Sequence, residues 1–470
     1  MRAVSKPQWL MLLYASGSLA AVVSYQAFST YIQFLYIDVL GLRAAWVGIT
    51  WSIYGLWNAV NDPLAGYWSD RTQTRWGRRI PWIAGLFIPL SLSFYLLWVP
   101  PAGFNGRSLL LYFLFFVLLF DLLWTIVVMN WTALFPEMVP DEKQRATVSA
   151  WRQIFSLFGL LIGVALPPIL AGEDWGNRGW MALLLTVVTA VSFGTSLLGS
   201  HERREFRQDD TLPLRQALRF TLTNRDFLFF LGTNLLIQYL FLAITSTVPF
   251  YTKYVLRIQS ALTIPRLNLT LDVATQNSVF LAAAFIVALP AMPLWTVVTR
   301  RIGAWRTLRV ACITTALSML GFFLAADFYT GLVFVFIFGV NLAGLLMLTD
   351  LLIADLVDAD ELVTGARREG LYFGMNGLVI RFAFTIQGII TGLVLTLTGY
   401  VSPTATELYP IQPETAVAGI RWMLAGFPAL ALLLAFFLLR GYTLHGDRLR
   451  QVQADVAALH EDKRSRLGGM

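Results

Sequence analysis

The stretch that decides the fold is WNAVNDPLAGYWSDRTQTRWGRRIPW, residues 57–82. It begins inside an apolar segment whose only acid is Asp62, breaks into a basic turn, and enters a second apolar segment at Pro81. Asn58, Asn61 and Asp62 are spaced so that they share one helix face. An acid inside a membrane-spanning segment is a functional candidate by default, because burying its charge is costly. A carboxylate with two amide oxygens can replace the hydration of a small hard cation, and it can equally hold a proton.

Composition places the chain among polytopic membrane proteins. Of its 470 residues, 57% are hydrophobic and 13% charged, whereas about 25% are charged in an average soluble domain. One cysteine excludes an internal disulfide and a cysteine metal site. The three histidines all lie in polar segments, so we expect no metal centre. The net charge of +7 resides mainly in loops, where membrane topology explains it, and we expect no nucleic-acid partner.

We predict twelve membrane-spanning helices, each long enough to cross a bilayer. Most lysines and arginines fall in alternate loops, which predicts a multi-pass protein of the cell (inner or plasma) membrane with an uncleaved first span and both termini in the cytoplasm. The predicted spans are residues 9–38, 46–67, 80–100, 109–136, 147–171, 180–199, 227–255, 276–298, 308–328, 332–358, 371–400 and 416–440.

The longest connection, residues 201–226, divides six spans from six. Its middle, Leu212 to Leu222, has the pattern of an amphipathic helix at the membrane surface. We therefore expect an N-terminal half at 1–200, this linker, a C-terminal half at 227–440, and a cytoplasmic tail at 441–470. The second half weakly repeats the basic turn of the first at Arg300-Arg301-Ile302-Gly303. This all-α layout is the plan of a major facilitator transporter, whose substrate sites lie near the midplane between the halves.

The basic turn after the second span has two compatible interpretations. One is membrane topology with a clamped loop; the other is a gate that latches the cytoplasmic ends of the halves in the outward-facing state through charged hydrogen bonds. Gly66 would allow the close approach, and an acid cluster after the tenth span would supply inter-half salt bridges rather than a divalent-cation site. The predicted gating residues are Gly66, Asp70, Arg71, Arg75, Arg78, Asp355 and Asp358.

The same stretch carries a family resemblance. Asn61-Asp62-Pro63, a glycine three residues after the proline, Arg75-Trp76-Gly77 and Pro81-Trp82 resemble the signature of the glycoside–pentoside–hexuronide:cation symporter family, to which melibiose permease belongs. The resemblance implies a cation-coupled secondary transporter of a sugar, glycoside or uronate that works by alternating access. We also expect a monomer in the lipid bilayer, with no cofactor beyond a coupling H+ or Na+. The alternative of another class is an integral-membrane enzyme, which would need a metal or nucleophile motif inside a span; no histidine lies in a predicted span, so we expect no enzymatic activity.

The resemblance also implies a cation site at Asn61 and Asp62, with Thr125 of the fourth span. The family has an acid one turn before Asp62, where this chain has Asn58. Asp121 shares a helix face with Thr125, and spans two and four run in the same direction, so we predict that Asp121 lies level with Asn58 and replaces that acid. The alternative is that Asp121 lies near the outer surface. Two close carboxylates tend to share a proton, so we favour H+ over Na+.

The substrate site implied by the resemblance is only partly kept. Arg152 matches an arginine of the family's fifth span, and Arg381 falls where the family has a lysine in span eleven. The family's two sugar-binding acids align with Val22 and Val128. This leaves two interpretations open: a carrier of a different or acidic sugar, or a carrier of an amphiphile with an anionic head, such as a lysolipid. The other candidate ligands are Tyr25, Gln26, Tyr31 and Gln33 of the first span and Asn130 and Trp131 of the fourth.

Overall fold

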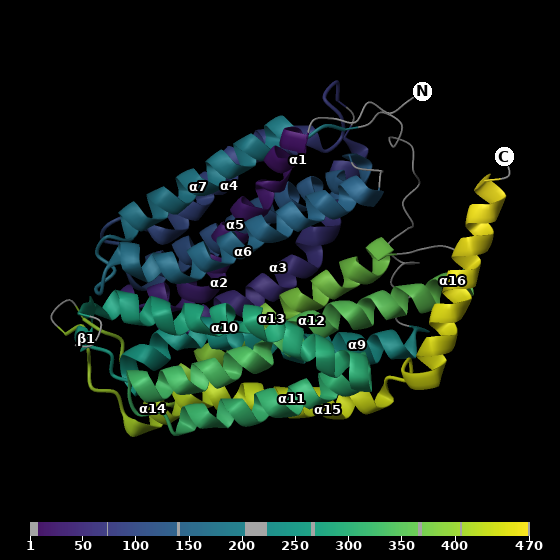
Figure 1. Ribbon diagram of the computed structural model, residues 1–470. Coiled ribbons are helices and arrows are strands. Elements are labelled where there is room, and N and C mark those ends of the chain that lie inside the picture. The colour runs from purple at the N-terminus through teal and green to yellow at the C-terminus, as the bar shows by residue number, and fades with distance from the viewer. Residues whose placement is uncertain are drawn as a thin grey trace.

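The computed structural model describes residues 8–72, 74–138, 142–202, 223–264, 268–364, 369–404 and 407–468. The described chain is almost entirely helical (Figure 1). The N-terminal helices are α1 (Gln8–Ala15), α2 (Gly17–Phe34), η1 (Leu35–Val39), α3 (Ala44–Arg71), α4 (Ile80–Trp98), α5 (Gly106–Met138), α6 (Glu142–Ala171) and α7 (Arg178–Gly199).

The C-terminal elements follow the same arrangement. They are α9 (Arg225–Phe250), η3 (Tyr251–Val255), α10 (Val273–Ile302), α11 (Ala304–Leu320), η5 (Gly321–Phe323), α12 (Phe328–Thr364), α13 (Glu369–Leu397), α14 (Glu414–Arg421), η6 (Trp422–Gly426), α15 (Phe427–Leu438), η7 (Leu439–Gly441) and α16 (Gly446–Gly468). A hairpin of β1 (Leu262–Ile264) and β2 (Leu269–Leu271) pairs antiparallel, with Leu262 opposite Leu271.

Ten of the described helices are long and apolar enough to cross a membrane. The helix is the natural form for such segments, since it satisfies every backbone polar group internally. Two further helices, α3 and α11, lie within the same bundle: α3 carries the polar residues of the site, and α11 is a short helix of 17 residues. The twelve-span prediction rests on counting these two. The predicted amphipathic helix at Leu212–Leu222 lies outside the described residues.

The two halves repeat one structural detail at the end of their first long helices. Helix α2 ends in the π-helical turn Leu35–Val39, and α9 ends in the π-helical turn Tyr251–Val255. A tyrosine of each turn donates to a carbonyl of its own half, Tyr36 to Leu97 at 2.9 Å and Tyr251 to Phe322 at 2.6 Å. This repetition agrees with a chain built from two related six-helix halves.

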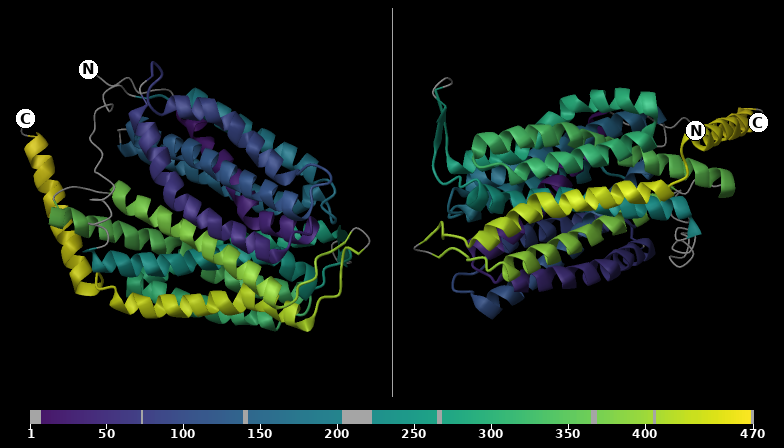
Figure 2. Two further views of the ribbon diagram at one scale, coloured as in Figure 1. Left: turned by 180° about the vertical axis from the view of Figure 1, so that it is seen from behind. Right: turned by 90° about the horizontal axis from the view of Figure 1, so that it is seen from below.

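The halves meet at one end of the molecule and diverge at the other. In Figures 1 and 2 they lie close together near β1, here called the outer end, and spread apart toward the end where α16 emerges, here called the terminal end. At the outer end α3 and α13 touch through glycines: a Cβ on Gly392 would lie 2.7 Å from the Cα of Gly48. Gly66, farther along α3 toward the terminal end, has no neighbour within 4 Å of its Cβ position. The structure is therefore closed at the outer end and open at the terminal end.

Candidate functional site

An arginine of α13 lies at the centre of the predicted cation site. The Nε of Arg381 is 2.8 Å from a carboxylate oxygen of Asp62, and its Nη1 is 3.4 Å from Asp121. The same guanidinium donates to Asn58 Oδ1 and, at 2.9 Å, to Thr125 Oγ1. Helices α3, α5 and α13 thus bring both acids, an amide and a hydroxyl around one side chain from the opposite half.

Asp121 faces this cluster from the buried side. Its side chain is 1% exposed, and its carboxylate accepts hydrogen bonds from the Tyr54 hydroxyl at 2.9 Å and from Asn61 Nδ2 at 2.8 Å. Both carboxylates contact Arg381, so Asp121 lies in the same cluster as Asp62. That the two acids bind one cation stays a prediction. The alternative position near the outer surface is excluded.

The cluster retains unused hydrogen-bonding capacity. Asp62 Oδ1 and Asn61 Oδ1 are buried oxygens without a hydrogen-bond partner. The Asp62 side chain is also the accessible one of the two acids, at 26% exposure. Buried acceptors are normally satisfied, so two unpaired oxygens on adjacent residues indicate a place where a proton or cation could bind.

A second inter-half cluster closes the outer end, and the sequence analysis missed it. The buried carboxylate of Asp38, at the end of α2, accepts from Lys253 Nζ and from the hydroxyls of Tyr254 and Tyr400. Nearby, Gln33 Nε2 donates to Gln387 Oε1 at 2.6 Å between α2 and α13. The sequence gives only a weak indication of this contact: Asp38 and Lys253 are charged residues at the ends of corresponding helices in the two halves. We call the set Asp38, Lys253, Tyr254 and Tyr400 the outer gate.

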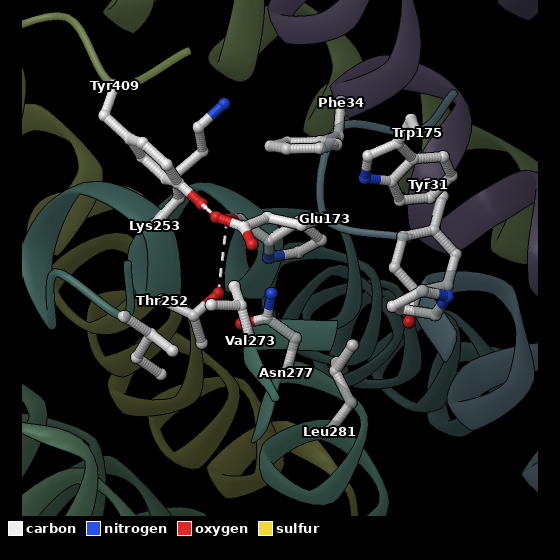
Figure 3. Close-up of a pocket in the computed structure, with 13 residues that line it drawn as sticks. Tyr31, Phe34, Glu173, Trp175, Thr252, Lys253, Val273, Asn277, Leu281 and Tyr409 are labelled. Carbon is white, nitrogen blue, oxygen red and sulfur yellow. Dashed lines mark hydrogen bonds between the residues drawn. The ribbon is translucent and has the colours of Figure 1, made fainter. Parts of the chain in front are cut away.

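A small pocket of about 30 Å³ lies between the halves beside the outer gate. Figure 3 shows Trp175, Phe34 and Tyr31 on one side and Lys253, Thr252 and Asn277 on the other. The Tyr409 hydroxyl donates to Glu173 across it, which joins the loop before α14 to the loop before α7. The outer end is therefore held by polar contacts as well as by the close α3–α13 packing.

Comparison with known proteins agrees with this geometry. The family described as "MFS/sugar transport protein" matches residues 13–446. The chain belongs to this family. It is 25% identical to an uncharacterised symporter, sll1374, of Synechocystis, over 94% of this chain and 96% of that protein. It is 25% identical to the isoprimeverose transporter of Lactiplantibacillus pentosus, over 83% and 80%. It is 22% identical to mouse sodium-dependent lysophosphatidylcholine symporter 1, over 97% and 89%.

A solved structure shows the same fold as this transporter. The bacterial homologue of the lysosomal transporter Spinster, in an inward-facing and unoccupied conformation, superposes with a TM-score of 0.67 at 13% identity, over 93% of this chain and 98% of that one. The fold is therefore that of the major facilitator superfamily, as predicted. The three relatives and the solved structure named here are all described as symporters or transporters, or as the homologue of one.

Two of the predicted solute ligands, Trp131 and Asn130, pack between helices of the N-terminal half. Trp131 is 3% exposed, stacks on Tyr14 at 5.2 Å and donates to Ser196 Oγ at 2.8 Å. Asn130 is 1% exposed, donates to the Ile126 carbonyl and accepts from Ser69. In this conformation both are packing residues between helices, because each polar atom is already satisfied within the N-terminal half. Their role as solute ligands stays a prediction for another conformation.

The other predicted ligands lie in different parts of the bundle. Arg152 lies over the rings of Trp131, at 4.6 Å, and Phe135, at 4.8 Å, and its buried Nε has no partner. Tyr25 stacks on Trp124 at 4.4 Å and meets Phe384 of α13 edge-on at 5.3 Å, so it lies between the halves. Gln26 donates to Thr30 Oγ1 at 3.1 Å at the packed α2–α6 contact. Arg381 itself belongs to the cation cluster.

The predicted gating residues lie at the open end. Arg78 is held within its own half by Glu202, whose carboxylate also accepts from the backbone N–H groups of Arg78 and Arg79. Asp355 accepts from Gln453 of the tail helix α16 at 3.3 Å, and Asp358 is half-buried beside it. Arg71 and Arg75 are exposed; the side chain of Asp70 lies outside the described residues. A latch between the basic turn and the acid cluster stays a prediction for the opposite conformation.

Proposed function

We propose that the chain is a cation-coupled symporter of a sugar or glycoside, in which Asp62, Asp121 and Arg381 couple the two fluxes. The observation that carries the proposal is the contact of both carboxylates with the one guanidinium that the opposite half supplies. Ionisable groups at mid-span are expensive to bury and are kept where they bind or move ions. A site that joins the halves is also where alternating access can be controlled.

The charge balance supports one coupling cation. With both acids ionised, two negative charges face one positive charge, so the cluster carries one uncompensated negative charge. A single H+ or Na+ would neutralise it. The two unpaired oxygens, Asp62 Oδ1 and Asn61 Oδ1, would receive that ion, and a shared proton is favoured because two close carboxylates do not both ionise readily.

Coupling follows if the cation competes with Arg381 for the carboxylates. Once an ion neutralises Asp62, the guanidinium is less strongly held and its donors become available to solute hydroxyls, which arginine can bind in bidentate fashion. By linkage, the solute that binds freed Arg381 must raise the affinity for the cation by the same factor. Tyr25, between the halves, would supply a stacking surface for the sugar ring.

The orientation is proposed from the charge pattern. The basic residues of the turn at 71–79 and of the α10–α11 connection lie at the terminal end, which the positive-inside rule assigns to the cytoplasm. The protein would then be a cell-membrane carrier with cytoplasmic termini, and the structure would be its inward-open state. The outer gate would be closed toward the outside.

The proposal is tested by ligand screening followed by transport. Purified protein is heated with a panel of pentoses, hexoses, glycosides, uronates and lysophospholipids, with and without Na+, at acidic and neutral pH. We expect a sugar or glycoside to raise the melting temperature, more so with the coupling ion, and to accumulate in proteoliposomes under an imposed ion gradient. Stabilisation by lysophospholipids alone would favour the second candidate, a carrier of an anionic-headed amphiphile, which Arg152 and Arg381 and the named mouse relative also support.

A further inference from the structure

Two arginines share one aromatic ring at the terminal end of the C-terminal half, away from the transport site. The guanidinium of Arg309 lies 4.4 Å from the ring centre of Phe436 and 4.7 Å from that of Trp305. Arg440 lies 5.7 Å from the same Phe436 ring and 4.8 Å from Phe437. A third arginine, Arg306, precedes Arg309 by three residues on α11 and so lies about one helical turn away on the same side. We call Arg306, Arg309 and Arg440 the arginine cluster.

No carboxylate of the described chain forms an ion pair with the arginine cluster. The nearest described acid that affects this region, Asp226, is already engaged by the backbone N–H and hydroxyl of Thr443 and lies 3.7 Å from Arg448. Arg309 Nε is buried without a hydrogen-bond partner. Topology explains why basic residues lie on this side, but it does not explain why Arg309 and Arg440 meet at the Phe436 ring without a counter-charge.

A histidine reports the excess of positive charge. His445 stacks on Trp305, with ring centres 3.9 Å apart and planes at 12°. Burial lowers its pKa below the ordinary value, and Arg306 and Arg309 lower that pKa further, against an opposing effect of Asp226. An anion bound among these groups would reverse the effect of the arginines on the pKa of His445.

The surface beside the cluster is exposed and apolar. On α11 the exposed side chains after Arg306 are Val310, Leu317 and Leu320, and on α15 those before Arg440 are Leu430, Leu433, Leu434 and Phe437. Each apolar stripe therefore ends in an arginine at the same boundary of the membrane. This combination matches the two parts of a phospholipid, whose acyl chains lie along the apolar stripes while its headgroup meets the charges.

We propose that the arginine cluster binds the phosphodiester of an anionic phospholipid, with the acyl chains of that lipid packed along α11 and α15. Guanidinium groups bind phosphate oxygens through paired, charge-assisted hydrogen bonds, and basic pockets between spans on the cytoplasmic side suit such headgroups. Arg309 supplies the buried donor, and Arg306 and Arg440 hold the headgroup from two helices. The ligand is a lipid rather than free phosphate, because the apolar stripes contribute to its binding.

Native mass spectrometry of the full-length protein with phosphatidylglycerol tests this site. The variant Arg306→Gln/Arg440→Gln keeps Arg309 and its ring contacts, so the fold should be preserved. We expect it to bind phosphatidylglycerol roughly 25-fold more weakly, at about fivefold for each lost arginine, with unchanged retention of phosphatidylcholine. The matched control is Arg450→Gln, which removes an exposed arginine on the same side that is already paired with Asp447 at 2.5 Å. Equal binding by the double variant and the control would overturn the proposal.

Two further measurements separate a lipid site from general attraction of anions. Millimolar glycerol phosphate should not displace the bound phosphatidylglycerol; displacement would show that only the free anion is recognised. Because the bound headgroup favours cationic His445, lipid affinity should rise as the pH falls from neutral to mildly acidic, and His445→Gln should remove that pH dependence. Asp226 also raises the pKa of His445, against the effect of Arg306 and Arg309. All three of these residues are unchanged in the His445→Gln variant. A pH dependence that survives His445→Gln would contradict this arrangement of the headgroup beside the histidine.

Discussion

Arg381 Nε lies 2.8 Å from the carboxylate of Asp62, which joins a residue predicted for the solute pocket to one predicted for the cation site. The predicted solute pocket and the predicted cation site are therefore in direct contact. A cation that neutralises Asp62 and a solute that needs the Arg381 guanidinium act on the same ion pair. Because the two residues share one ion pair, each single substitution in the cluster is expected to change cation coupling and solute binding in its own way.

Asp62→Asn should abolish uphill accumulation while leaving downhill exchange of solute. The amide keeps the shape and an acceptor for Arg381, but it can neither take up nor release a proton and provides a weaker ligand for sodium. Accumulation under an imposed ion gradient and exchange of labelled against unlabelled solute, measured in the same proteoliposomes, separate the two effects. Undiminished accumulation by the variant would remove Asp62 from the coupling site.

Arg381→Gln should tighten cation binding and weaken solute binding. Without the guanidinium, the charges of Asp62 and Asp121 are balanced only by the added ion, so we expect a gain of about tenfold or more in apparent cation affinity and a loss of solute-dependent stabilisation. Arg381→Lys keeps the positive charge and is the matched control for the Arg381→Gln variant. Both ligands can be followed by thermal shift. Loss of cation binding in Arg381→Gln would show that Arg381 supports the cation instead of competing with it.

The sequence predicted what depends on local spacing. The helix face shared by Asn58, Asn61 and Asp62, and the relation of Asp121 to Thr125, follow from helical periodicity within α3 and α5, and the structure agrees with both. Which residue of the other half completes the site depends on how the halves pack, and helical spacing does not determine that packing. Spacing alone therefore assigns Arg381 to the solute pocket and not to the cation site.

The same limit applies to the other residues of the site. Trp131 and Asn130 are polar or aromatic residues inside a span, and such residues also serve as buried contacts between neighbouring helices, as they do here with Ser196 and Ser69. Asp38 and Lys253 are far apart in the sequence, so their contact depends on how the outer ends of the two halves meet. In the sequence, each is a charged residue near the end of a span, which is common. Nothing in the sequence indicates that the two form a pair.

Lys253→Met should open the outer end. It leaves the buried carboxylate of Asp38 without its charged partner, and removing one member of a buried pair costs about 3–5 kcal/mol, enough to favour the state in which Asp38 is hydrated. Asn277→Cys, which lines the pocket in Figure 3, can report this, because the one native cysteine, Cys312, is buried. We expect a membrane-impermeant maleimide added from outside to label it about tenfold faster or more in the Lys253→Met background.

Asp38→Asn combined with Lys253→Met provides the control for that measurement. The double variant removes both charges, so the penalty for an unpaired carboxylate disappears and labelling of Asn277→Cys should return most of the way toward the rate in the unmodified background. Identical labelling rates with and without Lys253→Met alone would show that the pair does not hold the outer end closed.

Gly392→Ala should prevent closure of the outer end by another route. The added Cβ would lie 2.7 Å from the Cα of Gly48, and backbone atoms at that position cannot rotate away as a flexible side chain could. We expect the inward-open state to be depleted and net transport to fall about tenfold or more, with the protein still folded in its outward-open state. Gly85→Ala is the control, because nothing lies within 4 Å of the Cβ position of Gly85. Equal transport by the two variants would contradict a closing role for the Gly48–Gly392 contact.

Asp121 is the second acid of the site, and its position predicts the result of exchanging it with Asn58. Both side chains contact Nη1 of Arg381, Asn58 through its amide oxygen and Asp121 at 3.4 Å. Asn58→Asp with Asp121→Asn therefore keeps two acids around the guanidinium but moves one of them onto α3, beside Asp62. Asn at position 121 can still accept from the Tyr54 hydroxyl through its one oxygen, whereas the hydrogen bond from Asn61 Nδ2 to Asp121 is lost.

With both acids on α3, their oxygens and that of Asn61 come from one helix and can close around a single ion. We expect the exchange to shift coupling from H+ toward Na+, measured as accumulation under a sodium gradient compared with a proton gradient in the same vesicles. Asp121→Asn alone should lose accumulation, because one carboxylate would then be balanced by Arg381 and no net charge would remain to attract an ion. Normal accumulation by that single variant would mean that Asp62 couples the two fluxes by itself and that Asp121 serves only to position Arg381.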